Sequence, residues 1–156
     1  MKGSWWDLTR EEVAIGLMIG GNRMIRATFR RVEAGHGFNG DPWDVDVEGA
    51  CAEIAAYKSV GRYWSPSISK LKEEGGDGGP WDVRRRSEEW HDHLIRDNDP
   101  QDRPHILVIG RAPRFWVVGW LWGHEARRDE WRKSYGGREM AWFVPKGELR
   151  DMAELA

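Results

Sequence analysis

The segment Asp77-Gly78-Gly79-Pro80-Trp81-Asp82-Val83-Arg84 joins a glycine-rich turn to a short run that predicts a β-strand. On a strand, side chains at positions i and i+2 lie on the same face of the sheet. Asp82 and Arg84 are therefore expected side by side, and Asp77 in the preceding turn is expected to reach the same corner. Two carboxylates beside a cation can hold a divalent metal ion and stabilise charge on a phosphate. The segment therefore predicts a phosphate-handling site on a strand.

Size and composition indicate a single folded domain. The 156 residues are 40% hydrophobic and 32% charged, and a chain of this length can bury about 68–70% of its unfolded surface. The net charge of −2 provides no overall positive field, so any contact with nucleic acid needs local basic patches. The single cysteine and the lack of a signal-peptide pattern favour the cytoplasm of a bacterium or phage-infected cell. No apolar run approaches the ~18 residues of a membrane helix, so no membrane contact is expected.

A long amphipathic helix is expected over residues 9–33. Thr9 and Glu12 have the spacing of a capping box, in which each side chain accepts a hydrogen bond from the other residue's backbone N–H. Apolar residues then recur at helical spacing. Glycines inside a helix cost about 1 kcal/mol each, so those in this segment indicate a kink or a close helix contact: Gly16, Gly20 and Gly21.

A second helix is expected over residues 47–60, with Asp46 as its N-cap and small residues that allow close packing on a sheet. The clearest strand is 114–122, whose apolar run indicates burial on both faces. Its tryptophans alternate and are expected on one face: Trp116, Trp120 and Trp122. Further strands are expected at 67–71, 81–87, 94–96, 105–110 and 141–144, with a short charged helix at 125–133 and helical turns at 147–155.

The order of these segments predicts the α/β class, with one mixed-sheet domain flanked by helices over residues 1–156. A helical N-terminal part would span 9–61 and the motif-bearing sheet 67–122. A C-terminal helix and strand would occupy 124–156.

The order of the charged residues resembles a known family. Glu53 lies on the second expected helix and precedes Asp77, Asp82 and Arg84 in the chain. This is similar to the pattern of the PD-(D/E)xK, or restriction-endonuclease-like, nucleases. In those proteins a helix glutamate is followed by an aspartate at a strand start and by an acid-x-lysine on the strand. The resemblance covers about residues 46–122 and is to small phage-type members. It implies a restriction-endonuclease-like core.

The resemblance also implies an activity, namely Mg²⁺-dependent hydrolysis of phosphodiester bonds in nucleic acid, with DNA favoured and Mn²⁺ able to substitute. Asp77 and Asp82 would bind the metal, and Glu53 would complete the set directly or through water. Arg84 would contact the scissile phosphate and Arg86 would help hold the backbone. These acids and Arg84 are the candidate catalytic residues. Cutting both strands of a duplex would suit a homodimer.

Arg84 stands where the family has lysine, which leaves other interpretations open. Arginine stays charged but cannot act as a proton-transfer group. The same fold could therefore be a catalytically inactive binding or assembly module. A third option is a phage regulator or inhibitor protein whose fold only happens to include this turn and strand. Arg23, Arg26 and Arg30 form a basic stripe at helical spacing. With Arg84 and Arg86 they are candidate nucleic-acid contacts, and the alternative is a solvated helix face.

Other reactive side chains give weaker patterns. His91 and His93 lie two residues apart, a spacing that can bind a transition metal from one face of a strand. No further close Cys or His completes the usual zinc-ligand spacing, so an exposed hairpin is favoured instead. Cys51 lies among alanines and is expected to be a buried small residue rather than a nucleophile.

Overall fold

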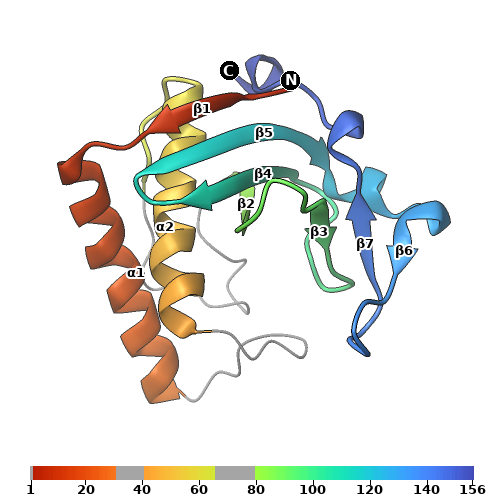
Figure 1. The fold of residues 1–156 in the computed structure, drawn as a ribbon, viewed down its shortest axis with the longest axis horizontal. Coiled ribbons are helices and arrows are strands. Elements are labelled where there is room, and N and C mark those ends of the chain that lie inside the picture. Colours follow the sequence, from red (N-terminus) through yellow and green to blue (C-terminus); the bar gives the residue numbers. More distant parts are fainter. Residues whose placement is uncertain (1, 31–40, 66–79) are drawn as a thin grey trace.

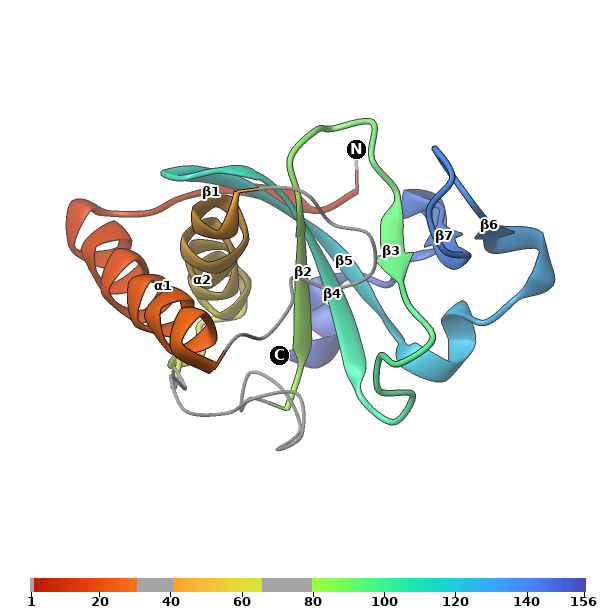
Figure 2. The ribbon, with the colours of Figure 1, turned by 90° about the horizontal axis from the view of Figure 1, so that it is seen from below.

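The computed structural model describes residues 2–30, 41–65 and 80–156. These residues form three layers, which Figure 2 shows from below. Helix α2 (Pro42–Ser59) covers one face of a four-stranded sheet, helix α1 (Arg10–Arg30) packs against α2, and a three-stranded sheet covers the other face. The first sheet consists of β1 (Ser4–Asp7), β2 (Asp82–Arg86), β4 (Pro104–Arg111) and β5 (Arg114–Trp122), and the second of β3 (His93–Ile95), β6 (Arg132–Lys133) and β7 (Ala141–Val144).

The larger sheet is mixed, with strand order β1-β5-β4-β2 (Figure 1). Strands β1 and β4 run antiparallel to β5, whereas β2 lies at the edge and runs parallel to β4. The smaller sheet has the order β3-β7-β6 and is antiparallel. The predicted α/β class with a mixed sheet is confirmed. The expectation that helices flank the sheet is correct for one face only, because the C-terminal segments form strands that cover the other.

Two apolar cores lie on the two faces of the larger sheet, because side chains alternate along each strand. The helix-side core joins α2 to the sheet through residues that include Ala52, Ala55, Ile106 and Val108. The inter-sheet core joins the two sheets through residues that include Ile95, Leu107, Ile109 and Val144. The face on which a side chain lies therefore decides which layer it meets.

Helix α1 begins as the sequence predicts. Thr9 N donates to Glu12 Oε1 and Glu12 N donates to Thr9 Oγ1, both at 3.1 Å, which completes the capping box. The internal glycines mark a close helix contact. A Cβ at Gly16 would lie 2.5 Å from Cys51 Sγ, and one at Gly20 would lie 2.5 Å from the Asp46 carbonyl oxygen. Glycine is therefore needed where α1 meets α2.

Helix α2 starts earlier than expected, at Pro42. Proline suits the first turn of a helix because its missing N–H would have no partner there. Asp46 therefore lies inside the helix, and its assignment as the N-cap was wrong. The small residues have the expected role, since five of them are fully buried between α1 and the sheet: Ala50, Cys51, Ala52, Ala55 and Ala56.

Strand β5 has the predicted bounds, but its tryptophans do not share a face. The ladder between β4 and β5 shifts at Leu107 and Val108, where a bulge on β5 inserts one extra residue. Trp116 consequently lies in the inter-sheet core, while Trp120 lies in the helix-side core with Trp122 against it. A bulge reverses the alternation of every residue beyond it, which the sequence pattern alone does not reveal.

Other elements differ from expectation. Strand β1 was not predicted, and it completes the sheet by pairing with β5. The expected helix at 125–133 is replaced by two 3₁₀ turns and β6, and the last helical turns are also 3₁₀. The strand expected at 67–71 lies outside the described residues.

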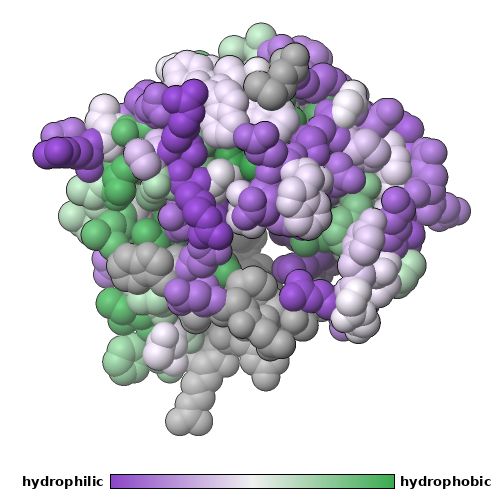
Figure 3. Space-filling model, in the orientation of Figure 1, coloured by the Kyte–Doolittle hydropathy of each residue, from purple (hydrophilic) through white to green (hydrophobic). Residues whose placement is uncertain are grey.

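The surface of the described part is hydrophilic over much of the face in Figure 3, and apolar surface gathers over α1 at the left. The exposed apolar side chains of this helix include Ile15, Met18, Ile25 and Phe29. Among the described helices, none is long and apolar enough to span a membrane. The homodimer stays a prediction.

Candidate functional site

Strand β2 carries its charged side chains on two different faces, as the sequence predicts. Val83 contacts the helix-side core. Asp82 pairs in register with His105 of β4, whose neighbour Ile106 lies in the helix-side core. Because side chains alternate, Asp82, Arg84 and Arg86 point toward the second sheet. Arg84 donates to the Leu94 carbonyl at 3.1 Å and to Asp99 Oδ1 at 3.0 Å, so it ties β2 to the β3 region.

A buried histidine lies beside Asp82. His105 Nδ1 is 3.5 Å from Asp82 Oδ1, and the other ring nitrogen of His105, Nε2, is 2.6 Å from the Pro100 carbonyl oxygen. A carbonyl only accepts, so Nε2 carries a proton, and Nδ1 can donate to Asp82 only in the imidazolium form. Burial raises the pKa of Asp82, but His105 and Arg84 outweigh it and lower this pKa to about 2. Asp82 is therefore ionised at neutral pH.

Glu53 lies elsewhere. It belongs to α2, which covers the helix side of the sheet, and its buried carboxylate meets Arg23 Nη1 of α1 at 2.6 Å. Asp82 points to the opposite side, so the expected convergence of Glu53 with Asp82 is not found. Asp77 lies outside the described residues. Within the described ranges, no three His, Cys, Asp or Glu side chains come together as a metal site. The described acids therefore do not by themselves fit Mg²⁺, and the magnesium site stays a prediction that depends on Asp77.

The predicted basic stripe on α1 includes two arginines whose side chains are described, and neither is fully exposed. The Arg23 side chain is turned toward α2 and only 15% exposed. Arg26 is half-buried. The side chain of Arg30 lies outside the described part of the chain. These residues also lie in the helix layer, separated by the sheet from the face that carries Asp82 and Arg86.

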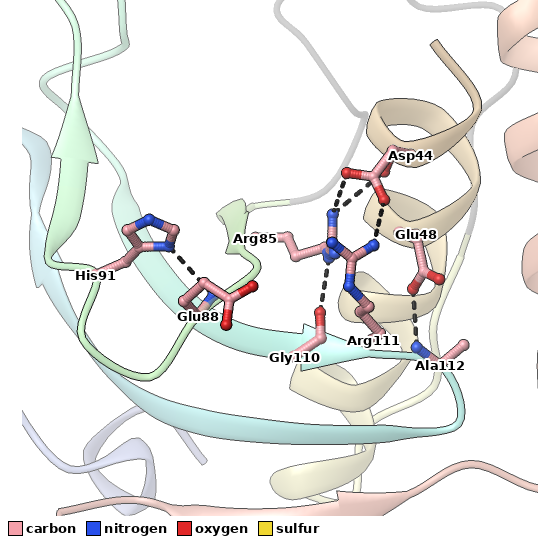
Figure 4. A network of polar contacts seen from close by, with 8 residues as sticks. All are labelled: Asp44, Glu48, Arg85, Glu88, His91, Gly110, Arg111 and Ala112. Atoms are coloured by element: carbon pink, nitrogen blue, oxygen red, sulfur yellow. Dashed lines mark hydrogen bonds and ion pairs between the residues drawn. The ribbon is translucent and has the colours of Figure 1, made fainter. Parts of the chain in front are cut away.

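The other face of β2 carries a structural network, drawn in Figure 4. Arg85 donates through Nε to the Gly110 carbonyl at 2.8 Å and meets Asp44 Oδ2 of α2 at 3.1 Å. Arg111 meets the other oxygen of Asp44 at 2.8 Å, and Ala112 N donates to Glu48 at 2.8 Å. These contacts join α2 to the end of the β4–β5 hairpin. The buried Arg85 side chain is bound to other residues of the protein.

A pocket of about 550 Å³ lies on the Arg86 side, between the β2–β3 connection (87–92) and the β6–β7 connection (134–140). Ligand sites typically have volumes of about 300–1,000 Å³. We call it the arginine pocket, because its lining combines three arginines with three aromatic residues: Arg86, Arg96, Arg138, Trp90, Tyr135 and Phe143.

The three arginines repel one another. Burial and the neighbouring cations Arg84, Arg96 and Arg138 lower the pKa of Arg86 to about 10. Burial and Arg84 likewise lower the pKa of Arg96. Both groups stay charged at neutral pH, but burial and neighbouring cations destabilise their charged forms. An anion in the pocket would offset that destabilisation.

Three carboxylates also line the pocket: Asp92, Asp97 and Glu139. Asp92 lies 3.6 Å from Lys146 Nζ, and Asp97 receives two hydrogen bonds from Arg132 at 2.7 and 3.1 Å. The lining itself therefore carries three positive and three negative charges. Lys146 and Arg132 pair with two of these three carboxylates, which lowers the negative charge that opposes the arginines.

Of the pocket residues, the sequence interpretation had singled out Arg86 and His91. Arg96 follows β3 and Arg138 precedes β7, about 40 residues later, and the pairing of β3 with β7 brings these segments together. No local sequence signal announces that pairing. The exposed-hairpin expectation was wrong for His93, which is fully buried and whose pKa is lowered by that burial to about 3. Cys51 is buried, as expected, and burial raises the pKa of its thiol to about 11.

Comparison of the chain with protein-family models, with curated proteins and with solved structures finds no match. The geometry of the described residues therefore carries the functional argument.

Proposed function

We propose that this protein binds nucleic acid and that the arginine pocket holds phosphate of the bound nucleic acid. The observation that supports this function is the grouping of Arg86, Arg96 and Arg138 in one pocket, where two of the three carboxylates are ion-paired with cations outside the lining. Guanidinium groups bind phosphate through parallel hydrogen bonds. A local patch of this kind is what a chain with a net charge of −2 needs in order to attract a polyanion.

The same proposal includes the finer fold assignment, a restriction-endonuclease-like core. It is supported by the order of the elements, since helix α2 with Glu53 precedes the edge strand β2 with Asp82 and Arg84. The separation of Glu53 from Asp82 and the pairing of Arg84 with Asp99 favour the binding module over the nuclease. A nuclease-like fold would then bind nucleic acid without cleaving it.

Salt-dependent binding of short labelled DNA and RNA strands tests the proposal. The logarithm of the affinity should fall linearly with the logarithm of salt concentration, by about 0.7 per phosphate contacted on a single strand. Arg86→Gln and Arg138→Gln should weaken binding and reduce that slope. Arg10→Gln removes the same charge from an exposed position on α1 and is the matched control. Equal effects of Arg10→Gln and Arg86→Gln would contradict the proposal.

Phosphodiester hydrolysis at Asp82 is the second candidate. Asp82 stays ionised, lies five residues after Asp77 in the chain, and shares its face of β2 with Arg86. The two positions are four residues apart, about 13 Å along a strand. A nucleic-acid strand with one phosphate in the arginine pocket could therefore extend to Asp82. Asp77 would have to complete that site.

Cleavage assays with Mg²⁺ and Mn²⁺ test this candidate on single-stranded, duplex and branched DNA and on RNA. Cleavage that disappears in Asp82→Asn, while the variant keeps its fold by circular dichroism, would establish hydrolysis there. Binding without cleavage under all conditions would leave the binding module.

A further inference from the structure

The arginine pocket has aromatic side chains at its opening as well as cations. Trp90, in the β2–β3 connection, is 76% exposed. Its ring lies 4.0 Å, between centroids, from the ring of the half-buried His91. Tyr135, in the β6–β7 connection, is 55% exposed and meets Phe143 edge-on at 4.7 Å. Large exposed aromatic side chains beside arginines need a reason other than core packing.

We infer that the arginine pocket holds one unpaired nucleotide, with its phosphate against the arginines and its base stacked on Trp90 or Tyr135. The inference rests on the proposed function and names the form of nucleic acid bound. Every base has a π-face, and stacking on an aromatic side chain contributes about 1–3 kcal/mol per base. A base inside a duplex is already stacked and cannot present that face.

The volume of the pocket agrees with the size of a single nucleotide. About 550 Å³ is suited to a drug-sized molecule such as a nucleotide, and it is too small for a double helix. A strand end or an unpaired position could enter, whereas a continuous duplex would have to expose a base first. The pocket should therefore select single strands, ends or unpaired bases.

The carboxylates of the pocket fit the same ligand. Asp97 and Asp92 are partly exposed and can accept hydrogen bonds from a base amino group or a sugar hydroxyl. They also repel phosphate, which confines it to the arginine side. His91 supports this arrangement, because burial and Arg86 lower its pKa and keep its ring neutral beneath Trp90.

Calorimetric titration with adenosine 5′-monophosphate, adenosine and inorganic phosphate tests the inference. The monophosphate should bind about tenfold or more tightly than either fragment, since stacking and phosphate contacts act together. Trp90→Ala should weaken monophosphate binding about tenfold and leave inorganic phosphate binding unchanged, and Trp90→Phe should restore much of the loss. Phe29→Ala, which removes an aromatic ring that is 84% exposed on α1, is the control and should have no effect.

An oligonucleotide with a 5′-terminal phosphate next to 2-aminopurine supplies a second signal, because the fluorescence of this base is quenched when it stacks. Quenching that depends on Trp90 or Tyr135, and tighter binding of single strands than of duplex, are expected. Binding that requires Arg86 but shows no quenching, or equal affinity for duplex, would overturn the inference and leave the proposed function standing. Failure of every oligonucleotide to bind would overturn both.

Discussion

Asp82 and His105 occupy paired positions on the parallel strands β2 and β4, with 3.5 Å between Asp82 Oδ1 and His105 Nδ1. The acid that the sequence assigns to a metal thus lies beside a fully buried histidine. Arg84, on the same face, places its positive charge near Asp82 and lowers the pKa of that carboxyl. Through Arg84, this corner is connected to β3 and to the segment that follows it.

Asp82→Asn should destabilise the fold at neutral pH by about 1–3 kcal/mol, the usual cost of removing one partner of a buried polar pair. The pKa of Asp82 is about 2 in the folded protein against an ordinary 3.8. Its contribution is therefore fully present above pH 3.8 and is lost as the pH falls through 2. Urea unfolding at pH 7 and pH 3 measures the effect, which should be smaller at pH 3. An Asp102→Asn control at an exposed position should change little.

His93→Leu should stabilise the protein, by about 1–3 kcal/mol at neutral pH, since both buried ring nitrogens lack a hydrogen-bond partner among the described residues. The gain should increase in acid. The folded pKa is about 3 against 6.5, so the unfolded state binds the extra proton between these values and wild-type stability falls as the pH drops from 6.5 to 3. Melting curves at pH 7 and pH 5 compare the proteins. A gain that shrinks at pH 5 would contradict this account.

Two neighbouring glycines of α1 give opposite predictions. Gly20→Ala would place a Cβ 2.5 Å from the Asp46 carbonyl oxygen and from Val47 Cα, so it should destabilise the contact between α1 and α2. Gly21→Ala would meet no atom within 4 Å and should stabilise the helix by about 1 kcal/mol. Thermal unfolding of both variants measures the difference. Similar changes of the same sign would show that α1 does not pack on α2 at Gly20.

Asp44→Ala should destabilise the fold by about 1–3 kcal/mol, because the buried Arg85 guanidinium would lose its ion pair with the Asp44 carboxylate and keep the backbone carbonyls of Gly110 and residue 44 as partners. Arg111→Ala removes the exposed ion pair to the same carboxylate and should cost less than about 1 kcal/mol. Chemical denaturation of the two variants compares them directly. Equal losses would show that the burial of Arg85 is not what matters.

Local sequence patterns predicted the parts of the fold that depend on near neighbours. The capping box of Thr9 and Glu12, the apolar run of β5 and the alternation of Asp82 with Val83 are of this kind. Each reflects helix or strand geometry over a few residues. The α/β class followed from their order.

The features that were missed depend on pairing between distant segments. The bulge that separates Trp116 from Trp120 is a property of two strands together. The second sheet exists because β3 pairs with β7, about 50 residues later, and this pairing creates the arginine pocket. Asp77, Asp82 and Arg84 form a recognisable motif because they are close together in the chain. Glu53 precedes Asp82 by 29 residues, and its local helix pattern did not show that its carboxylate pairs with Arg23 of α1, away from Asp82.

The location of nucleic-acid binding is tested most directly by NMR of the protein during titration with a short single-stranded oligonucleotide. We predict selective shifts of the side-chain Nε–H signals of Arg86, Arg96 and Arg138 and of the Trp90 indole N–H. The Arg10 signal on α1 should stay unchanged. Shifts confined to the helix layer, or none at saturating oligonucleotide, would contradict the assignment of the arginine pocket.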